Sequence, residues 1–267
     1  MGYFQKGRCM RREPGKGSMR YYSTQYWNRG KRNRNEDSLC IEQVQTRRGR
    51  VLLAMVCDGI GGLAGGEIAS GYVAEEVLKW FYEDGMKAMR FGNMECVAQG
   101  LKKRLEQICD SLFLYGKERG IRLGTTASIL FLWEHRFFLF HIGDSRIYRI
   151  RFGCRQLTKD QINAEGALLQ AVGASGQCIP QIQFGRIVAG DRFLICSDGF
   201  YRKQKGHNLC RMFGRKASDF LGTKKEKNWE KILKESAEAL LRKGETDNIS
   251  AVFICCLKGG RTHGSRL

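Results

Sequence analysis

The chain has 267 residues, of which 42% are hydrophobic and 10% aromatic, and this composition is typical of a globular protein rather than a disordered one. Its formal net charge is +19 at pH 7, and no apolar run approaches the roughly 20 residues that a membrane-spanning helix requires. The basic N-terminus has no apolar stretch after its charges, so a secretory signal is not predicted and we expect a cytoplasmic protein.

The positive charge is concentrated in three segments. Residues 1–34 carry +9, residues 200–234 carry +8 and residues 258–267 contain three basic residues, whereas the remainder carries only −1. Such segments attract phosphoproteins, nucleic acid or anionic membranes, or are simply solvated surface. We expect a flexible basic extension over residues 1–19, one folded domain over residues 20–257 and a basic tail over residues 258–267.

Apolar periodicity predicts an α+β chain that is rich in strands. An apolar run over residues 51–57 has the length of a buried strand, and the spacing becomes helical over 68–81 and again over 94–112. The later elements are expected to be strands at about 126–133, 136–142, 146–151 and 191–196, a helix over 229–241 and a final strand over 249–257. Because several connections are short, we expect antiparallel sheets with helices packed outside them.

The eleven cysteines predict neither a disulfide framework nor a zinc site. They are odd in number and scattered, and none forms a Cys-x-x-Cys pair. Cys57, Cys196, Cys255 and Cys256 lie in or beside the apolar runs. There a cysteine usually behaves as a small buried hydrophobe, and we expect that behaviour rather than a redox role.

Acidic residues stand at the ends of the predicted strands. They are Glu36, Asp37, Asp58, Asp144, Asp198 and Asp247. A strand holds its terminal residue rigidly, and the glycine that follows Asp58 and Asp198 lets backbone or water approach closely. One Asp-Gly pair alone predicts only a turn. Several carboxylates without Cys or His partners favour a hard cation such as Mg²⁺ or Mn²⁺.

Seven short motifs occur in a fixed order along the chain. They are Arg32-x-x-Asn35-Glu36-Asp37, Asp58-Gly59-Ile60-Gly61-Gly62, Gly124-Thr125-Thr126, Gly143-Asp144-Ser145-Arg146, Leu157-Thr158-x-Asp160, Cys196-Ser197-Asp198-Gly199 and Asp247-Asn248. Over about residues 20–257 this series resembles the protein phosphatase 2C family in its bacterial form. The resemblance implies a sandwich of two antiparallel sheets flanked by helices, in α-β-β-α order. It also implies a metal-dependent protein serine/threonine phosphatase.

The resemblance implies a role for each acidic motif. The implied ligands of two cations, Mn²⁺ or Mg²⁺, are Glu36, Asp37, Asp58, the carbonyl of Gly59, Asp198 and Asp247. Asp58 resembles the carboxylate that bridges both cations. Arg32 resembles the arginine that binds phosphate, for which its planar fork is suited. The implied reaction is attack on phosphoserine or phosphothreonine by a water that the two cations activate, so no nucleophilic Cys or Ser is required. The implied partner is a phosphoprotein substrate, with a cognate serine/threonine kinase as a further possible partner, and the basic segment 200–234 leads us to expect an acidic substrate.

Three positions depart from the family pattern. Gln161 stands where the family often has His, and residues 162–190 form a shorter segment than the usual flap. Arg202 replaces an aspartate that, together with the equivalent of Asp144, can hold a third cation in bacterial relatives. Asp144 is therefore a possible remnant of a third-metal site. We hypothesise that Arg202 pairs with Asp144, and the alternative is that Arg202 points outward.

Other classes of function are also open. Gly59-Ile60-Gly61-Gly62-Leu63-Ala64 imitates a dinucleotide-binding fingerprint, but Asp58 would repel a pyrophosphate and a βαβ unit is not predicted. A catalytically weak phosphatase-like module that binds or scaffolds is the main alternative, and the three departures favour it. The basic ends with Tyr26 and Trp27 suggest nucleic acid, but no binding module accompanies them and we expect none to bind.

Overall fold

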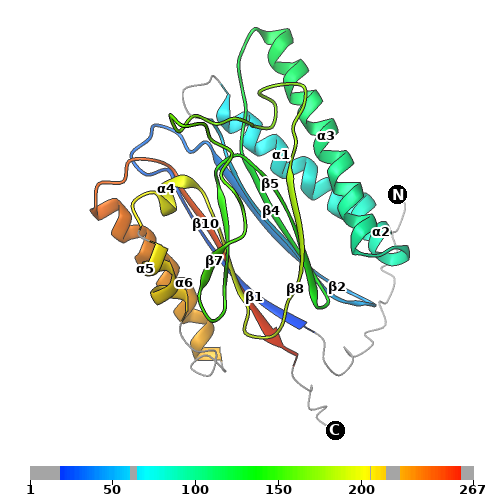
Figure 1. Ribbon diagram of the computed structural model, residues 1–267, viewed down its shortest axis with the longest axis vertical. Coiled ribbons are helices and arrows are strands. Elements are labelled where there is room, and N and C mark those ends of the chain that lie inside the picture. The colour runs from blue at the N-terminus through cyan, green and yellow to red at the C-terminus, as the bar shows by residue number, and fades with distance from the viewer. Residues whose placement is uncertain (1–18, 61–64, 205, 215–222, 260–267) are drawn as a thin grey trace, which may run out of the picture.

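Two antiparallel sheets of five strands form the centre of the computed structural model, which describes residues 19–60, 65–204, 206–214 and 223–259 (Figure 1). The first sheet has the order β1 (Met19–Asn28), β10 (Ile249–Lys258), β9 (Arg192–Cys196), β6 (Arg146–Ile150) and β7 (Cys154–Gln156). The second sheet has the order β2 (Asp37–Thr46), β3 (Gly49–Asp58), β4 (Ala127–Trp133), β5 (Arg136–Ile142) and β8 (Gln181–Arg186). The expected sandwich is confirmed.

Helices cover the outer face of each sheet (Figure 1). The second sheet is covered by α1 (Gly66–Trp80), the π-helical turn η1 (Phe81–Gly85), α2 (Met86–Phe91) and α3 (Met94–Arg119). The first sheet is covered by α4 (Asp198–Tyr201), α5 (Gly206–Phe213) and α6 (Thr223–Arg242). Three apolar clusters fill the spaces between these four layers, one under each helical layer and one between the sheets.

Strand β3 shows why a continuous apolar run forms the middle of this sandwich. Leu53 and Met55 point into the cluster under α1 and α3, while Leu52 and Ala54 point into the cluster between the sheets. All four are fully buried. Because side chains alternate along a strand, a strand that is buried on both faces needs apolar residues at every position.

The strands and helices predicted from apolar runs are all present, and the elements that were missed are more polar. Strand β1 was not predicted, because Met19–Asn28 mixes aromatic, basic and hydroxyl side chains and is only partly buried. The edge strand β8 was missed because it alternates half-buried and exposed residues. The four cysteines of the apolar runs, Cys57, Cys196, Cys255 and Cys256, are buried as expected.

The strand directions also decide one alternative function. Strand β3 pairs antiparallel with both β2 and β4, so the loop after Asp58 does not belong to the parallel unit that a dinucleotide fingerprint requires. Residues 61–64 of that loop lie outside the described residues. The expected extension over 1–19 and tail over 258–267 also fall almost wholly outside them and stay predictions. In the described part of the chain, no helix has the length and apolar character needed to cross a membrane.

Truncation of Phe253 should destabilise the protein strongly. Its ring is fully buried in β10 and lies 4.6 Å from that of Trp229 and 5.1 Å from that of Phe213, measured between centroids. We expect Phe253→Ala to lower the free energy of unfolding by about 3–5 kcal/mol, because a cavity remains where the ring was. Chemical denaturation measures the loss. Phe91→Ala is the control, since Phe91 is 81% exposed and its removal should change stability by less than about 0.5 kcal/mol.

Candidate functional site

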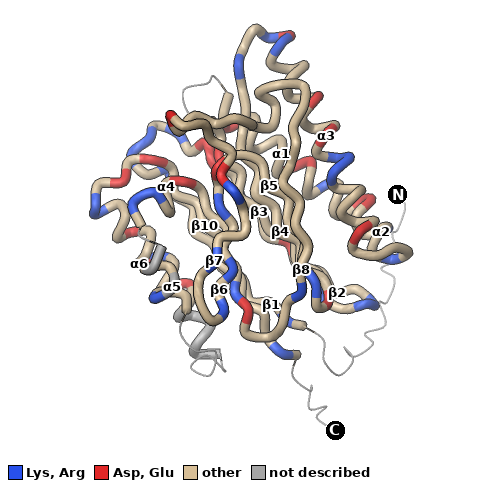
Figure 2. The backbone as a smooth tube through the Cα atoms, viewed as in Figure 1, with Lys and Arg blue, Asp and Glu red and all other residues tan. Residues whose placement is uncertain are grey.

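Carboxylates from both sheets converge at one end of the sandwich. Asp37 begins β2 and Asp58 ends β3, and the two residues lie directly opposite each other in the antiparallel pair. From the first sheet, Asp198 follows β9 at the start of α4, and Asp247 precedes β10. In Figure 2 acidic segments gather near α4 at this end of the sandwich. Like charges directly opposite one another destabilise a strand pair, so this arrangement favours a bound proton or a compensating positive charge.

A hydroxyl joins the two sheets beneath these carboxylates. Ser197, the residue after β9, donates a hydrogen bond of 3.0 Å from Oγ to Oδ2 of Asp37. Both residues are buried. The other oxygen of Asp37, Oδ1, is buried without a hydrogen-bond partner among the described residues. A carboxylate oxygen in that position is costly unless a cation or a donor reaches it.

Burial and mutual repulsion disfavour the charged forms of these groups. Burial raises the pKa of Asp37 to about 7. The charges of Asp198 and Asp247 add to this rise, and hydrogen bonds to Asp37 oppose it. Burial also raises the pKa of Asp58 well above its ordinary value, with Asp37 as the next largest cause. The pKa of Asp198 rises to about 6, mainly through burial. A group of carboxylates that resists ionisation is typical of a site that receives cations.

The donor chemistry of this end of the sandwich fits a hard divalent cation, because it offers carboxylate and backbone oxygens and an unpartnered buried oxygen on Asp37. Gly59 is required by the tight approach of the surrounding backbone. A Cβ at Gly59 would lie 2.5 Å from the carbonyl oxygen of Gly66 and 2.6 Å from that of Glu36. The side chains are nevertheless not in a ligating arrangement, since no group of three or more His, Cys, Asp or Glu residues in the described ranges is placed to hold an ion.

Two arginines occupy the positive positions instead. Arg32 donates from Nε and Nη2 to the two carboxylate oxygens of Asp247, each at 2.9 Å. Arg202 pairs with Asp198, four residues earlier on α4, and its Nη1 lies 3.8 Å from Oδ2 of Asp247. Our prediction that Arg202 pairs with Asp144 was therefore wrong. A helical turn places residue 202 over residue 198, which makes Asp198 the nearer partner.

Asn248 fixes the segment that carries Arg32. Its side-chain nitrogen donates to the carbonyl oxygens of Arg29 and Arg34, both at 2.9 Å, and its side-chain oxygen accepts from the backbone nitrogen of Glu36 at 2.8 Å. One amide therefore satisfies three backbone groups of the loop before β2. Asn248 belonged to one of the sequence motifs, but its role was not predicted because the sequence alone does not show that the two ends of the domain meet.

The motif around Asp144 forms a braced turn. Tyr201 donates from its hydroxyl to the carbonyl oxygen of Asp144 at 3.0 Å. Gln161, which stands where the family often has His, exchanges two hydrogen bonds of 2.8 Å with the backbone of Gly143. Burial raises the pKa of Asp144 and the nearby Asp160 adds to the effect, whereas the positive charge of Arg202 opposes it. The structure thus brings Asp144 to the edge of the carboxylate group and gives Gln161 a supporting role.

A buried polar network supports the ends of β3, β4 and β5. The backbone nitrogen of Asp58 donates to Oγ1 of Thr126 at 2.9 Å, and Thr126 and Ser145 share a hydrogen bond of 2.8 Å. Ser128 bonds Nδ1 of His141 at 2.9 Å and donates to the carbonyl oxygen of Ser145 at 3.1 Å. Four polar residues thereby fix the position of Asp58 relative to the Asp144 turn.

Comparison with known proteins gives one family. The model of the family described as "Protein phosphatase 2C" matches residues 26–252. The serine/threonine protein phosphatase PstP of Mycobacterium tuberculosis is 31% identical over 195 residues, which are 63% of this chain and 34% of the relative. The chain therefore spans about a third of the length of that relative.

Solved structures share the fold. The serine/threonine phosphatase Stp1 from Staphylococcus aureus superposes with a TM-score of 0.76 at 21% identity, over 92% of this chain and 99% of that one. The catalytic domain of PstP, in complex with two manganese ions, superposes with a TM-score of 0.68 at 22% identity, over 90% of this chain and all of that one. At these identities the superpositions establish the architecture.

Acid should destabilise the protein through His141. Burial lowers the pKa of His141 to about 4, whereas an unfolded histidine titrates near 6.5. Between these values the unfolded chain binds a proton that the native state does not, so this contribution to stability is lost as the pH falls from about 6.5 to 4. We expect the free energy of unfolding of His141→Gln, relative to the parent, to rise by roughly 2–3 kcal/mol over this range. His135→Gln is the control, and a constant difference between parent and variant would contradict the prediction.

Removal of Arg202 should strengthen the binding of divalent cations. Its guanidinium pairs with Asp198 and approaches Asp247, so it competes for oxygens that a cation would need. Because its side chain is 56% exposed, solvent screens part of this effect, and we expect Arg202→Ala to lower the Kd for Mn²⁺ by about tenfold. Isothermal titration calorimetry on protein freed of metal measures the change. Arg47→Ala, at an exposed position in the turn between β2 and β3, should leave the Kd unchanged.

Proposed function

The chain belongs to the protein phosphatase 2C family, and we propose that it is a metal-dependent protein serine/threonine phosphatase. The observation that carries this proposal is the convergence of Asp37, Asp58, Asp198 and Asp247 on one end of the sandwich, where Arg32 pairs with Asp247. Its substrates are phosphoserine and phosphothreonine proteins, which a serine/threonine kinase would produce. The name of the mycobacterial relative and the family match both support this class of reaction.

We assign the cation ligands to the acidic residues of the converging strand ends. They are Glu36, Asp37, Asp58, the carbonyl of Gly59, Asp198 and Asp247, with Asp144 as the remnant of a third site. Two divalent cations, Mn²⁺ or Mg²⁺, would supply Lewis acidity and an activated water at neutral pH. The donor set and the unpartnered buried oxygen of Asp37 support this assignment.

Arg32 is assigned to the phosphoryl group. Its side chain is 48% exposed, and its planar fork already holds two carboxylate oxygens of Asp247 in the bidentate geometry that phosphate also accepts. Exchange of Asp247 for phosphoryl oxygens would orient the substrate above the carboxylates. Asn248 keeps the loop of Arg32 in place during this exchange. Positioning and charge stabilisation are the protein's main contributions to such a reaction.

A catalytically weak binding module is the second candidate, and Arg202 is the observation that favours it. The guanidinium pairs with Asp198 and lies near Asp247, which are two of the proposed ligands. Arginine neutralises these carboxylates, but it does not acidify a water by inner-sphere binding as a metal does. If Arg202 kept its place in the presence of cations, the protein would bind phosphoproteins without hydrolysing them efficiently.

Hydrolysis of a phosphothreonine peptide should require Mn²⁺ or Mg²⁺. Asp58→Asn and Asp198→Asn should each lower kcat/KM by on the order of a hundredfold or more, because each removes negative charge from the proposed cation site while keeping the size of the side chain. Phosphate release in the presence of Mn²⁺, Mg²⁺ or chelator is the measurement. Asp110→Asn, on the exposed face of α3, is the matched control and should behave as the parent.

Two outcomes would contradict the proposal. Full activity in chelator would remove the cations from the mechanism. An Asp58→Asn variant as active as the parent would show that the carboxylate of Asp58 is not required for the reaction. Binding of the phosphopeptide without turnover at any Mn²⁺ concentration would instead support the second candidate.

A further inference from the structure

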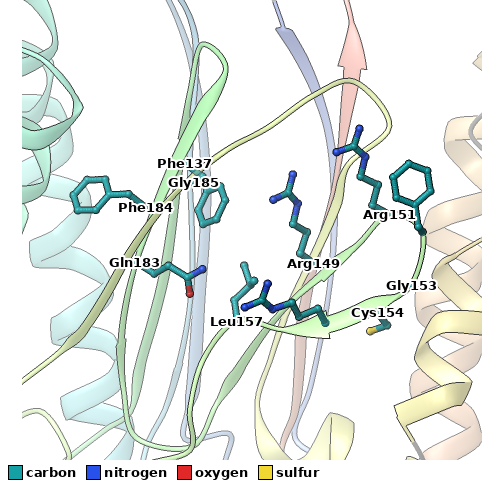
Figure 3. Close-up of a pocket in the computed structure, with 11 residues that line it drawn as sticks. Phe137, Arg149, Arg151, Gly153, Cys154, Leu157, Gln183, Phe184 and Gly185 are labelled. Carbon is teal, nitrogen blue, oxygen red and sulfur yellow. The ribbon is translucent and has the colours of Figure 1, made fainter.

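The two sheets separate at one side of the sandwich and leave an open groove. Strands β7 and β8 are the last strands of their sheets, and within the described ranges each pairs on one side only. A cavity of about 520 Å³ lies between them. Figure 3 shows Arg149, Arg151 and Leu157 on one side of this groove and Phe137 and Gln183 on the other. We call it the edge groove.

The edge groove has an apolar floor and a basic rim. Phe137 and Leu157 are buried members of the cluster between the sheets and form part of the lining. Arg149, Arg151 and Arg155 also line it. Figure 2 shows basic segments around β6 and β7 on this side of the molecule. A floor of this kind accepts an apolar side chain, and the rim attracts negative charge.

The protein neutralises the arginines of the groove only in part. Asp191 is the carboxylate that reaches them, with its oxygens 2.6 Å from Nη2 of Arg149 and 3.6 Å from Nε of Arg151. No ion pair to Arg155 is present within the described part of the chain. Two guanidinium groups therefore share one carboxylate and the third has none, which leaves about two positive charges in the groove.

The pairing of β6 with β7 increases this imbalance. Arg149 and Arg155 lie directly opposite each other in the antiparallel register. Like charges at such positions destabilise a strand pair, and here Asp191 offsets the charge of Arg149 while that of Arg155 stays available to an anionic ligand. Phe152, in the turn of the same hairpin, is 95% exposed and also lines the groove. The guanidinium of Arg151 lies 4.9 Å from the centroid of this ring, and an exposed aromatic ring beside such a cation is typical of an interaction site.

The groove lies apart from the carboxylate site. Phe137 is near the start of β5, and the five steps to Ile142 at its other end correspond to about 17 Å at roughly 3.4 Å per residue. The turn of Gly143 and Asp144 follows Ile142 directly. An extended peptide advances roughly 3.3 Å per residue, so it would span this distance with about six residues.

We propose that the edge groove is a docking site for an acidic segment of the phosphoprotein substrate, located about six or more residues from the phosphorylated residue. This inference rests on the proposed function for the identity of the partner. The acidic side chains contact Arg151 and Arg155, and an apolar side chain of the same segment contacts Phe152 and Phe137. The groove is open along the two edge strands, which suits a chain segment better than an enclosed small molecule.

The test compares phosphothreonine peptides that carry the same acidic block at different distances from the phosphate. Arg151→Glu combined with Arg155→Glu should lower kcat/KM about tenfold for a peptide with a spacer of about six residues, through KM rather than kcat. Hydrolysis of a short phosphopeptide without the block should be unchanged. Arg149 is kept because it makes the shorter ion pair with the buried Asp191, 2.6 Å against 3.6 Å for Arg151. The control, Arg20→Glu combined with Arg47→Glu, makes the same charge change at exposed positions near β1 and β2, the opposite edges of the two sheets.

Direct binding separates this inference from the proposed function. Fluorescence anisotropy of an unphosphorylated acidic peptide, measured in chelator, should show a Kd that rises about tenfold in the Arg151/Arg155 variant and not in the control. If the acidic peptide binds in this way but no substrate is hydrolysed, the proposed function is overturned and the groove remains a binding site for acidic peptides. Three outcomes would overturn the docking site. The first is an equal effect of the two double variants on peptide binding. The others are competition by pyrophosphate as effective as that by the acidic peptide, and tighter binding of a single-stranded oligonucleotide than of the peptide.

Discussion

Repulsion between buried carboxylates is the constraint on which the rest of this structure depends. Asp37 and Asp58 face each other across β2 and β3, and Asp198 and Asp247 approach from the other sheet. Such a group stays together only if rigid elements hold each member in place. The sandwich meets this requirement, because the apolar strand β3 is buried on both faces and ends at Asp58. Stability of the core thus offsets the electrostatic cost of the site.

The negative charge of the carboxylates can be compensated by arginines or by cations. The two cannot occupy the same carboxylate oxygens at the same time. In the structure Arg32 and Arg202 supply it by pairing with Asp247 and Asp198. In the proposed enzyme bound cations would supply it, and Arg202 would turn away toward solvent. An i,i+4 pair on a short helix suits such an exchange, because rotation of one long side chain is enough and the backbone of α4 keeps its place.

Much of this architecture follows from the sequence, and the exceptions have physical reasons. Strands β3, β4 and β5 were predictable because they are apolar on both faces. Each acidic strand end was recognised from its own short motif. Their convergence was not, because it depends on strand pairing between segments that are far apart in the sequence. The partner of Arg202 was mistaken, although its distance of four residues from Asp198 on a helix was a usable signal. The edge groove was not foreseen, because Arg149 and Arg155 become neighbours only through the β6–β7 register.

The pairing of β1 with β10 has a consequence for the order of events during synthesis. Met19 lies opposite Lys258, and β10 also separates β1 from β9 in the sheet. Strand β1 therefore leaves the ribosome long before its partner exists, by tens of seconds at roughly 5–20 residues per second. The loop of Arg32 is held by Asn248 at the start of that same late strand. The nascent chain cannot assemble the site until β10 has been made, so in the proposed enzyme an incomplete polypeptide would have no means of acting on phosphoproteins around the ribosome.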